Sequence, residues 1–215
     1  MQAFLPRWSP DGSEIVFSAK LPDAFWNIDV ISSEGGTPER ILPSEHNQMD
    51  ANWSPDGNSL VFGINDDLSA PIYTIDLRTK RVSALPGSTG LFSSRWSPDG
   101  RFIAAFQNNS IALLIFDFTT REWTKAFPSQ AFYETFSHDG KYVYFMNVPA
   151  PDYKPRVLRL RLSDRKIEEV VDLKKAGHLL RGRLGAWFGI APDDSPLVTR
   201  DISTQEIYAL DMDWP

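Results

Sequence analysis

The sequence contains 215 residues, of which 42% are hydrophobic and 23% charged, as in an ordinary globular protein. Its 28 acidic and 22 basic side chains give a net charge of −6, which speaks against nucleic acid or an anionic membrane as a partner. There is no cysteine, so disulfides, thiolate zinc sites and cysteine nucleophiles are excluded. No run approaches the roughly 20 apolar residues of a membrane span, and no signal peptide is visible, so the compartment stays unknown.

A pentapeptide repeat organises the chain. Trp-Ser-Pro-Asp-Gly occurs at 8–12, 53–57 and 96–100, and degenerate copies follow at 136–140 and 190–194. The first positions are 45, 43, 40 and 54 residues apart, and three identical pentapeptides at nearly even spacing indicate a repeat architecture. Proline fixes φ, aspartate bonds to nearby amides and glycine supplies a positive φ, so each copy predicts a tight turn between two strands.

The segments around each turn predict strands in chain order. The first copy predicts strands at 3–7, 14–18, 26–30 and 40–42, the second at 48–52, 59–62, 72–77 and 82–85, and the third at 91–95, 102–106, 113–117 and 123–126. The fourth predicts strands at 132–135, 142–145, 157–161 and 167–171, and the fifth at 184–188, 196–199 and 207–211. No segment has a convincing helical period, and four strands in about 40–45 residues is the unit of a propeller blade.

We therefore predict an all-β fold, a single β-propeller domain over residues 1–215 with about five four-stranded blades. The blades are expected near 1–45, 46–88, 89–129, 130–175 and 184–215. The last blade is incomplete, which leaves unpaired strand edges and predicts an open or imperfectly closed ring. The repeat residues predicted to be structural are Trp8, Asp11, Gly12, Trp53, Asp56, Gly57, Trp96, Asp99, Gly100, Phe136, Asp139, Gly140 and Asp193.

These motifs resemble the WD-like propeller repeat of the TolB family over essentially the whole chain. Phe136 and His138 depart from the pattern in the fourth copy, and 190–194 departs further in the fifth. Segments 187–196 and 205–210 are more similar to a bacterial subset, in which such a propeller follows a winged-helix or Ser/Thr-kinase domain. The resemblance implies a sensing or protein-interaction module. It implies neither DNA binding nor kinase activity, because those effector domains are not in this sequence.

The sequence shows no catalytic constellation. Its three histidines fall at unrelated places in the repeat, and no nucleophile elbow, zinc-protease motif or Gly-rich phosphate loop occurs. Asp50 and Glu134 are the only acids on the predicted inner strands. Arg7 and Arg95 share one repeat position, where we expect them to brace neighbouring strands. We predict no catalytic, cofactor-binding or metal-binding residues.

An insertion between the fourth and fifth copies carries a cluster of cations. It contains His178, Arg181 and Arg183, which form a candidate partner-binding loop because loops on rigid scaffolds often carry function. A solvated connector in an acidic protein is the more ordinary explanation of the same residues.

The leading hypothesis for function is a non-catalytic scaffold that presents loops and a central funnel to a protein or peptide partner. One alternative is a self-assembling fragment of a longer regulator, which forms a homodimer through the incomplete blade. Another is the propeller accessory domain of a hydrolase or peptidase. Oligomeric state distinguishes the first alternative, and acids or histidines converging in the funnel would favour an enzyme.

Overall fold

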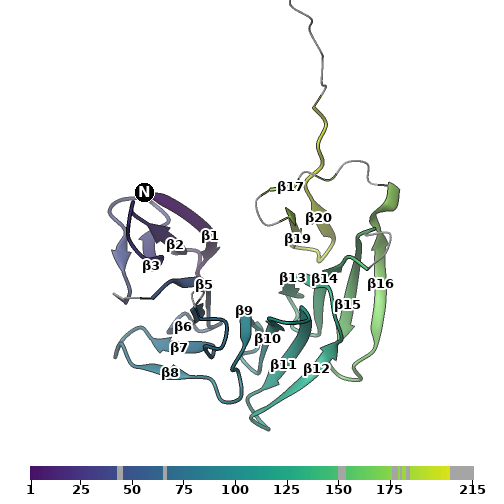
Figure 1. The fold of residues 1–215 in the computed structure, drawn as a ribbon, viewed down its shortest axis with the longest axis horizontal. Helices are drawn as coiled ribbons and strands as arrows, with labels where there is room; N and C mark the ends of the chain where they lie inside the picture. The colour runs from purple at the N-terminus through teal and green to yellow at the C-terminus, as the bar shows by residue number, and fades with distance from the viewer. Residues whose placement is uncertain are drawn as a thin grey trace, which may run out of the picture.

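A computed structural model describes residues 1–42, 46–64, 67–149, 154–175, 179, 181–182 and 185–203. Antiparallel sheets follow one another along the chain as the blades of a propeller (Figure 1). Four of the sheets have four strands each, ordered as in the sequence, so each blade is a meander. The predicted all-β propeller is thereby confirmed. Within the described ranges, no helix has the length and apolar character needed to cross a membrane.

The strands of the four blades have the following bounds. Blade 1 contains β1 (Gln2–Trp8), β2 (Glu14–Lys20), β3 (Asn27–Ser32) and β4 (Glu39–Arg40), and blade 2 contains β5 (Gln48–Trp53), β6 (Ser59–Ile64), β7 (Tyr73–Asp76) and β8 (Val82–Ala84). Blade 3 contains β9 (Leu91–Trp96), β10 (Phe102–Gln107), β11 (Ala112–Asp117) and β12 (Glu122–Phe127). Blade 4 contains β13 (Ala131–Phe136), β14 (Tyr142–Asn147), β15 (Arg156–Arg161) and β16 (Ile167–Asp172), and the 3-10 turn η1 (Leu173–Lys175) follows it.

The fifth copy forms less than a blade. Its described part consists of two short sheets, β17 (Arg181–Gly182) with β18 (Gly185–Ala186), and β19 (Phe188–Ile190) with β20 (Pro196–Val198). The prediction of five four-stranded blades is therefore wrong, since the described chain has four such blades and these two short sheets. Gly185 weakens the predicted inner strand 184–188, so that β19 begins only at its end. The predicted strand 207–211 lies outside the described residues.

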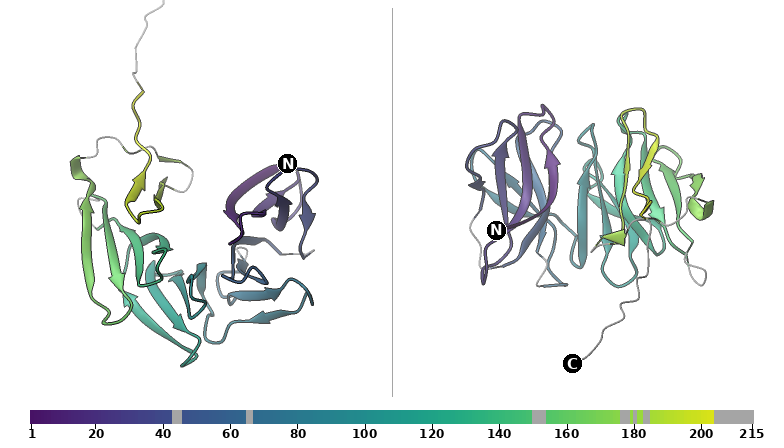
Figure 2. Two further views of the ribbon diagram at one scale, coloured as in Figure 1. Left: turned by 180° about the vertical axis from the view of Figure 1, so that it is seen from behind. Right: turned by 90° about the horizontal axis from the view of Figure 1, so that it is seen from above.

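The blades stand side by side along an arc (Figures 1 and 2). Blade 1 and the β19–β20 sheet lie at the two separate ends of this arc in Figure 1. The first strands of the blades, β1, β5, β9 and β13, lie on its inner side, so residues far apart in the sequence approach one another there.

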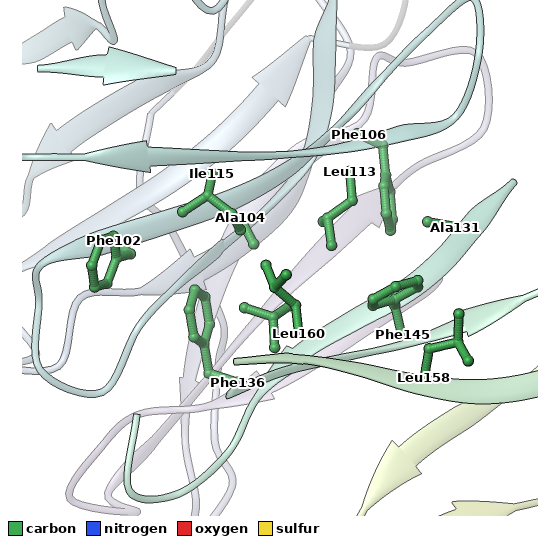
Figure 3. Packing of buried hydrophobic residues seen from close by; sticks show 11 residues of the cluster. Phe102, Ala104, Phe106, Leu113, Ile115, Ala131, Phe136, Phe145, Leu158 and Leu160 are labelled. Carbon is green, nitrogen blue, oxygen red and sulfur yellow. The ribbon is translucent and has the colours of Figure 1, made fainter. Parts of the chain in front are cut away.

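Apolar side chains pack between neighbouring blades, with one cluster at each junction. Between blades 3 and 4, Phe106 and Ile115 meet Phe136 and Phe145 (Figure 3). Ile115 and Phe145 are fully buried. Burial of such a side chain stabilises the fold by about 1.5–3 kcal/mol, so the junctions supply much of the hydrophobic stabilisation.

The aromatic residues of the second, third and fourth motifs take part in these junctions. Trp53 is 5% exposed and Phe136 is 7% exposed, and each packs in the cluster shared with the preceding blade. Trp96 is half-buried at the junction of blades 2 and 3. Trp8 occupies the same repeat position but is 62% exposed, because blade 1 begins the arc.

Candidate functional site

The pentapeptide turns are held by a recurring set of hydrogen bonds. Ser9 Oγ donates to Asp11 Oδ1 at 2.6 Å, and the Ser13 amide donates to the same oxygen at 3.0 Å. The same bonds recur in the next three copies, at Asp56, Asp99 and Asp139. The Ser9 hydroxyl, together with the Ser13 amide and hydroxyl, lowers the pKa of Asp11 to about 2. These carboxylates therefore hold the turn closed.

Neighbouring turns meet through proline and glycine. Pro10 Cδ lies 3.9 Å from the position that a Cβ would take on Gly57, and Pro55 Cγ lies 3.4 Å from that of Gly100. Both glycines also have a positive φ, +71° and +75°, which a residue with a side chain adopts at a cost. The positive φ of the turn therefore favours glycine, whereas the proline of the preceding blade lies at an ordinary contact distance.

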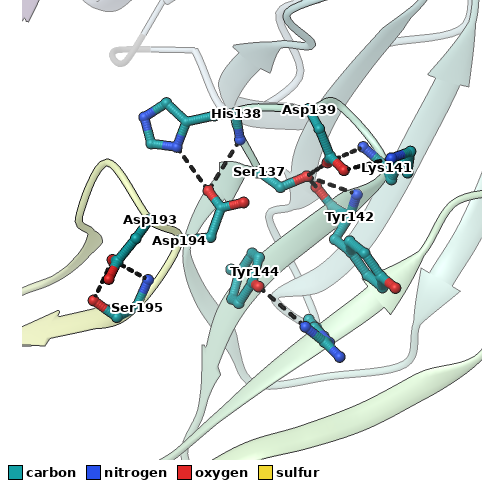
Figure 4. A network of polar contacts seen from close by, with 10 residues as sticks. Ser137, His138, Asp139, Lys141, Tyr142, Tyr144, Asp193, Asp194 and Ser195 are labelled. Atoms are coloured by element: carbon teal, nitrogen blue, oxygen red, sulfur yellow. Dashed lines mark hydrogen bonds and ion pairs between the residues drawn. The ribbon is translucent and has the colours of Figure 1, made fainter.

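One junction replaces this contact by a polar one (Figure 4). His138 stands at the proline position of the fourth copy, and Asp194 at the glycine position of the fifth. His138 Nδ1 is 2.7 Å from Asp194 Oδ1, and the His138 amide donates to the same oxygen at 3.0 Å. Asp194 keeps the positive φ of the position, at +63°. The two departures from the repeat are therefore partners across one junction.

Each inner strand of the four blades contains a β-bulge three residues before the motif aromatic. Leu5, Asp50, Ser93 and Tyr133 have φ values of +55°, +57°, +53° and +56°, and the strand register shifts at these places. Such backbone geometry is uncommon for residues with a side chain and accompanies functional sites. No glycine marks the position, so the sequence analysis missed it. In the sequence, the bulge position can be recognised only by its fixed distance of three residues from the motif aromatic.

Asp50 joins three inner strands. Its Oδ1 lies 3.5 Å from Arg7 Nη2 of β1 and 3.0 Å from Arg95 Nη2 of β9. Ser93 Oγ donates to Asp50 Oδ2 at 2.9 Å. The exposed fractions of the Arg7, Asp50 and Arg95 side chains are 30%, 17% and 12%, so the group is accessible mainly at Arg7. The prediction that the two arginines brace neighbouring strands is confirmed, and Asp50 is the group that they share.

These charges tune one another. Burial opposes ionisation of Asp50, but Arg95 and Arg7 hold the pKa of its carboxyl below the ordinary value. Burial and the neighbouring charge of Arg95 lower the pKa of Arg7 to about 10. All three groups are therefore charged at neutral pH, and together they carry one net positive charge.

Glu134 lies close to this cluster on β13. It is 2% exposed, and neither of its carboxylate oxygens has a hydrogen-bond partner among the described residues. Burial raises the pKa of Glu134 to about 8, although the charge of Arg95 favours the ionised form. Glu134 is therefore mostly neutral at pH 7. A buried carboxyl group with a raised pKa beside charged groups is typical of functional sites.

A cavity of about 270 Å³ adjoins the motif tryptophans. It is lined by Trp8, Pro10, Asn52, Trp53, Pro55, Trp96, Ser97 and Pro98. Arg7 and Arg95 directly precede two of these tryptophans in the sequence. Trp53 Nε1 donates to the Arg7 carbonyl oxygen at 3.1 Å, which ties the cavity wall to the charged cluster. Tryptophan and arginine are among the residue types that contribute most to protein interfaces.

The candidate loop lies largely outside this description. His178 and Arg183 fall outside the described residues, and Arg181 is the first residue of β17, where it pairs with Ala186. Its role in binding stays a prediction. Within the part of the chain that the structure describes, no three His, Asp or Glu side chains gather as they would around a metal ion.

Comparison with known proteins places the chain. The sequence model of the family described as the TolB beta propeller domain matches residues 2–149. The chain belongs to this family. The Tol-Pal system protein TolB of Coxiella burnetii (strain RSA 493 / Nine Mile phase I) is 34% identical to this TolB-type propeller over 70 residues, which are 31% of this chain and 16% of that protein.

Solved structures show the same fold. TolB from Acinetobacter baumannii is similar at a TM-score of 0.69 and 20% identity, over 90% of this chain and 52% of that one. A puromycin-hydrolyzing peptidase of Mycobacterium tuberculosis is similar at a TM-score of 0.59 and 18% identity, over 92% of this chain and 34% of that one. This TolB-type propeller thus spans about half of the first structure and a third of the second, and at these identities the likeness shows the fold alone.

Proposed function

We propose that this TolB-type propeller is a non-catalytic module that binds a protein or peptide at the inner-strand surface of blades 1 to 3. Two observations carry the proposal: the cavity wall that includes the exposed Trp8, and the Asp50 cluster, whose most exposed member, Arg7, directly precedes Trp8 in β1. Tryptophan and arginine supply most of the binding energy in many protein interfaces. Rigid inner strands hold these groups in place, which reduces the entropy lost on binding.

The charge of the cluster favours a partner segment of defined chemistry. Asp50 neutralises only one of the two arginines, and Arg7 is the more exposed of them. An extended segment with an apolar side chain for the tryptophan cavity and a carboxylate for Arg7 satisfies both features. The overall net charge of −6 makes this local positive surface selective, since acidic segments are repelled elsewhere.

The cluster is a poor catalyst by its chemistry. Two guanidinium groups stabilise the Asp50 carboxylate, which weakens it as a general base. Glu134 has a pKa of about 8 but makes no hydrogen bond to a group it could activate. These features favour binding over proton transfer.

Selection from a displayed random-peptide library tests the proposal. Peptides enriched on the full chain are expected to carry an acidic and an aromatic or aliphatic residue. Trp8→Ala and Arg7→Gln are each expected to weaken their binding by about tenfold or more, measured by fluorescence polarisation. Arg121→Gln is the matched control, because Arg121 is exposed on a turn of blade 3 and lines neither cavity.

Two outcomes would contradict the proposal. One is the enrichment of peptides that bind Trp8→Ala and Arg7→Gln as tightly as the unaltered chain. The other is turnover of chromogenic esters or aminoacyl amides by the purified chain, if Asp50→Asn or Glu134→Gln abolishes that turnover.

The likeness to the peptidase supports a second candidate, the propeller accessory domain of a larger hydrolase. Such a domain also binds without catalysing. The second candidate therefore predicts that the inner strands contact a hydrolase domain in place of a free peptide. Cross-linking of the chain within its full-length natural protein separates the two, because only an accessory domain cross-links Arg7 or Trp8 to a domain of the same polypeptide.

Self-association is a further proposal for the ends of the arc. Trp8 at one end is 62% exposed, and Trp187 and Leu197 at the other are 48% and 43% exposed. Exposed apolar groups of this size favour association with a second copy. Light scattering over a tenfold concentration range measures it, and a mass that stays monomeric throughout would exclude a homodimer.

A further inference from the structure

A second cavity, of about 370 Å³, lies at the junction of blades 3 and 4. Its wall is formed by the pentapeptide turn and the β15–β16 turn of blade 4, together with the start of β10 and the end of β11 in blade 3. None of its lining residues belongs to an inner strand, so the cavity is separate from the Asp50 cluster. Its ionisable lining residues are Arg101, Asp117, Lys141, Tyr142, Arg161 and Arg165.

Three of the four cations in this wall have carboxylate partners. Arg101 Nη2 lies 2.8 Å from Asp117 Oδ2, and Lys141 Nζ lies 2.8 Å from Asp139 Oδ2. Arg161 pairs with acidic side chains of its own blade. The charges of these three groups are compensated within the protein, although their remaining N–H groups still line the cavity.

Arg165 is the fourth cation. It has no carboxylate partner among the described residues, and its Nη1 is buried without a hydrogen-bond acceptor. Burial lowers the pKa of Arg165, but a guanidinium group stays protonated in proteins. A buried donor on a charged group is costly when it has no acceptor, and Arg165 is also one of the residues that line the cavity.

The partial burial of Arg165 is not a general feature of its position in the repeat. Lys80 and Arg121 occupy the same turn position in blades 2 and 3, with φ values of +56° and +59°, and Arg165 has the same φ of +59°. Lys80 and Arg121 are exposed, whereas Arg165 is partly buried within reach of the charges of Arg101 and Asp117 on the neighbouring blade. The difference is therefore a property of the blade 3–4 junction.

We propose that this cavity binds an oxyanion of the phosphate class, with Arg165 as its principal ligand and Arg101, Arg161 and Lys141 around it. Guanidinium groups bind phosphate through paired N–H donors, and the N–H groups that the three paired cations do not use add donors around Arg165. A volume of about 370 Å³ is near the lower end for small-molecule sites, which fits inorganic phosphate or a small phosphate monoester.

Calorimetric titration of the full chain with inorganic phosphate, at constant ionic strength set with sodium chloride, tests the site. Arg165→Gln is expected to weaken phosphate binding by about tenfold or more. Arg121→Gln is the matched control and is expected to leave the affinity unchanged, because it removes the same charge from the same turn position of blade 3. Sodium acetate serves as the carboxylate probe, and glycerol 3-phosphate as the monoester.

Nitrogen-proton NMR spectra locate the ion and verify that the variants are folded. Phosphate is expected to shift the amide signals of Lys141 and Ser163, which line the cavity. The proposal is overturned by absence of phosphate binding, by equal binding to Arg165→Gln, by shifts confined to other blades, or by acetate binding as tightly as phosphate. Tighter binding of the monoester than of phosphate, with the same shifts, supports a phosphorylated ligand, and the reverse order supports the free ion.

Discussion

His138 and Asp194 form a hydrogen bond, with Nδ1 and Oδ1 2.7 Å apart, at a junction where the earlier blades pack a proline against a glycine. Each substitution taken alone looks like decay of the repeat. Together they exchange a close apolar contact for a charged hydrogen bond across the same junction. The pair links blade 4 to the β19–β20 sheet, which has only two strands to hold it in place.

Restoring the repeat at this junction should therefore require both changes. His138→Pro removes the ring that meets Asp194, and Asp194→Gly leaves the ring of His138 without its partner. We expect the double variant to be more stable than the sum of the single effects predicts, with a coupling of about 0.5–1 kcal/mol. Urea unfolding of the four proteins measures the cycle, and purely additive effects would show that the pair does not couple the sheets.

The motif tryptophans should differ sharply in their contribution to stability. Trp53→Ala opens a cavity in the junction of blades 1 and 2 and is expected to lower the free energy of unfolding by about 3–5 kcal/mol. Trp8→Ala is expected to change it by less than about 1 kcal/mol, because the side chain is 62% exposed. Urea denaturation followed by circular dichroism compares them, and similar losses for both would mean that Trp8 is buried in solution.

Neutralising Asp50 should destabilise the inner strands. In Asp50→Asn the guanidinium groups of Arg7 and Arg95 remain close together without a counter-charge, which is expected to cost about 3 kcal/mol of stability. Ser93→Ala removes only one hydrogen bond to the carboxylate and is expected to cost about 1 kcal/mol. Thermal unfolding ranks the variants, and an Asp50→Asn protein as stable as Ser93→Ala would contradict the shared ion pair.

Glu134 should make stability fall as the pH rises. Its pKa is about 8 in the folded protein, against 4.5 for a free glutamate side chain. Between these two pH values the folded state binds more protons than the unfolded state, so the free energy of unfolding falls as the pH rises, by at most about 1.4 kcal/mol per pH unit. The stabilisation by protonated Glu134 is complete below about pH 4.5 and is lost by about pH 8. Glu134→Gln is expected to flatten the dependence and to stabilise the protein above neutral pH. Urea unfolding at several pH values measures this, with Glu122→Gln on the exposed strand β12 as the control.

The sequence predicted the blades well because their determinants are local. A Ser-Pro-Asp-Gly turn is closed by hydrogen bonds between residues that are two or five positions apart. Asp11 bonds to Ser9 and Ser13, and the Glu14 amide donates to Ser9 Oγ. The same reasoning failed for the fifth copy. Its motif still forms a turn, but the strand 184–188 contains Gly185, and the motif aromatic is replaced by Ile190, so that only a short two-stranded sheet forms.

The candidate sites could be predicted only in part. Asp50 and Glu134 were identified as the acids of the inner strands, and Arg7 and Arg95 as equivalent positions, yet nothing in the sequence showed that one carboxylate serves both arginines. The bulges that aim these side chains carry no glycine, so turn chemistry does not reveal them. Arg165 cannot be told apart from Arg121 by its place in the repeat.

By itself, then, the sequence determined a TolB-type propeller of four-stranded blades, because hairpins and turns depend on residues close together in the chain. Only the tertiary structure decided which charges meet. Asp50 is 43 residues from Arg7 and 45 from Arg95, and the curvature of the arc brings all three to its inner side. Burial then gave Glu134 a pKa of about 8 and left the buried Nη1 of Arg165 without an acceptor, because exclusion of water depends on how blades pack and not on the repeat.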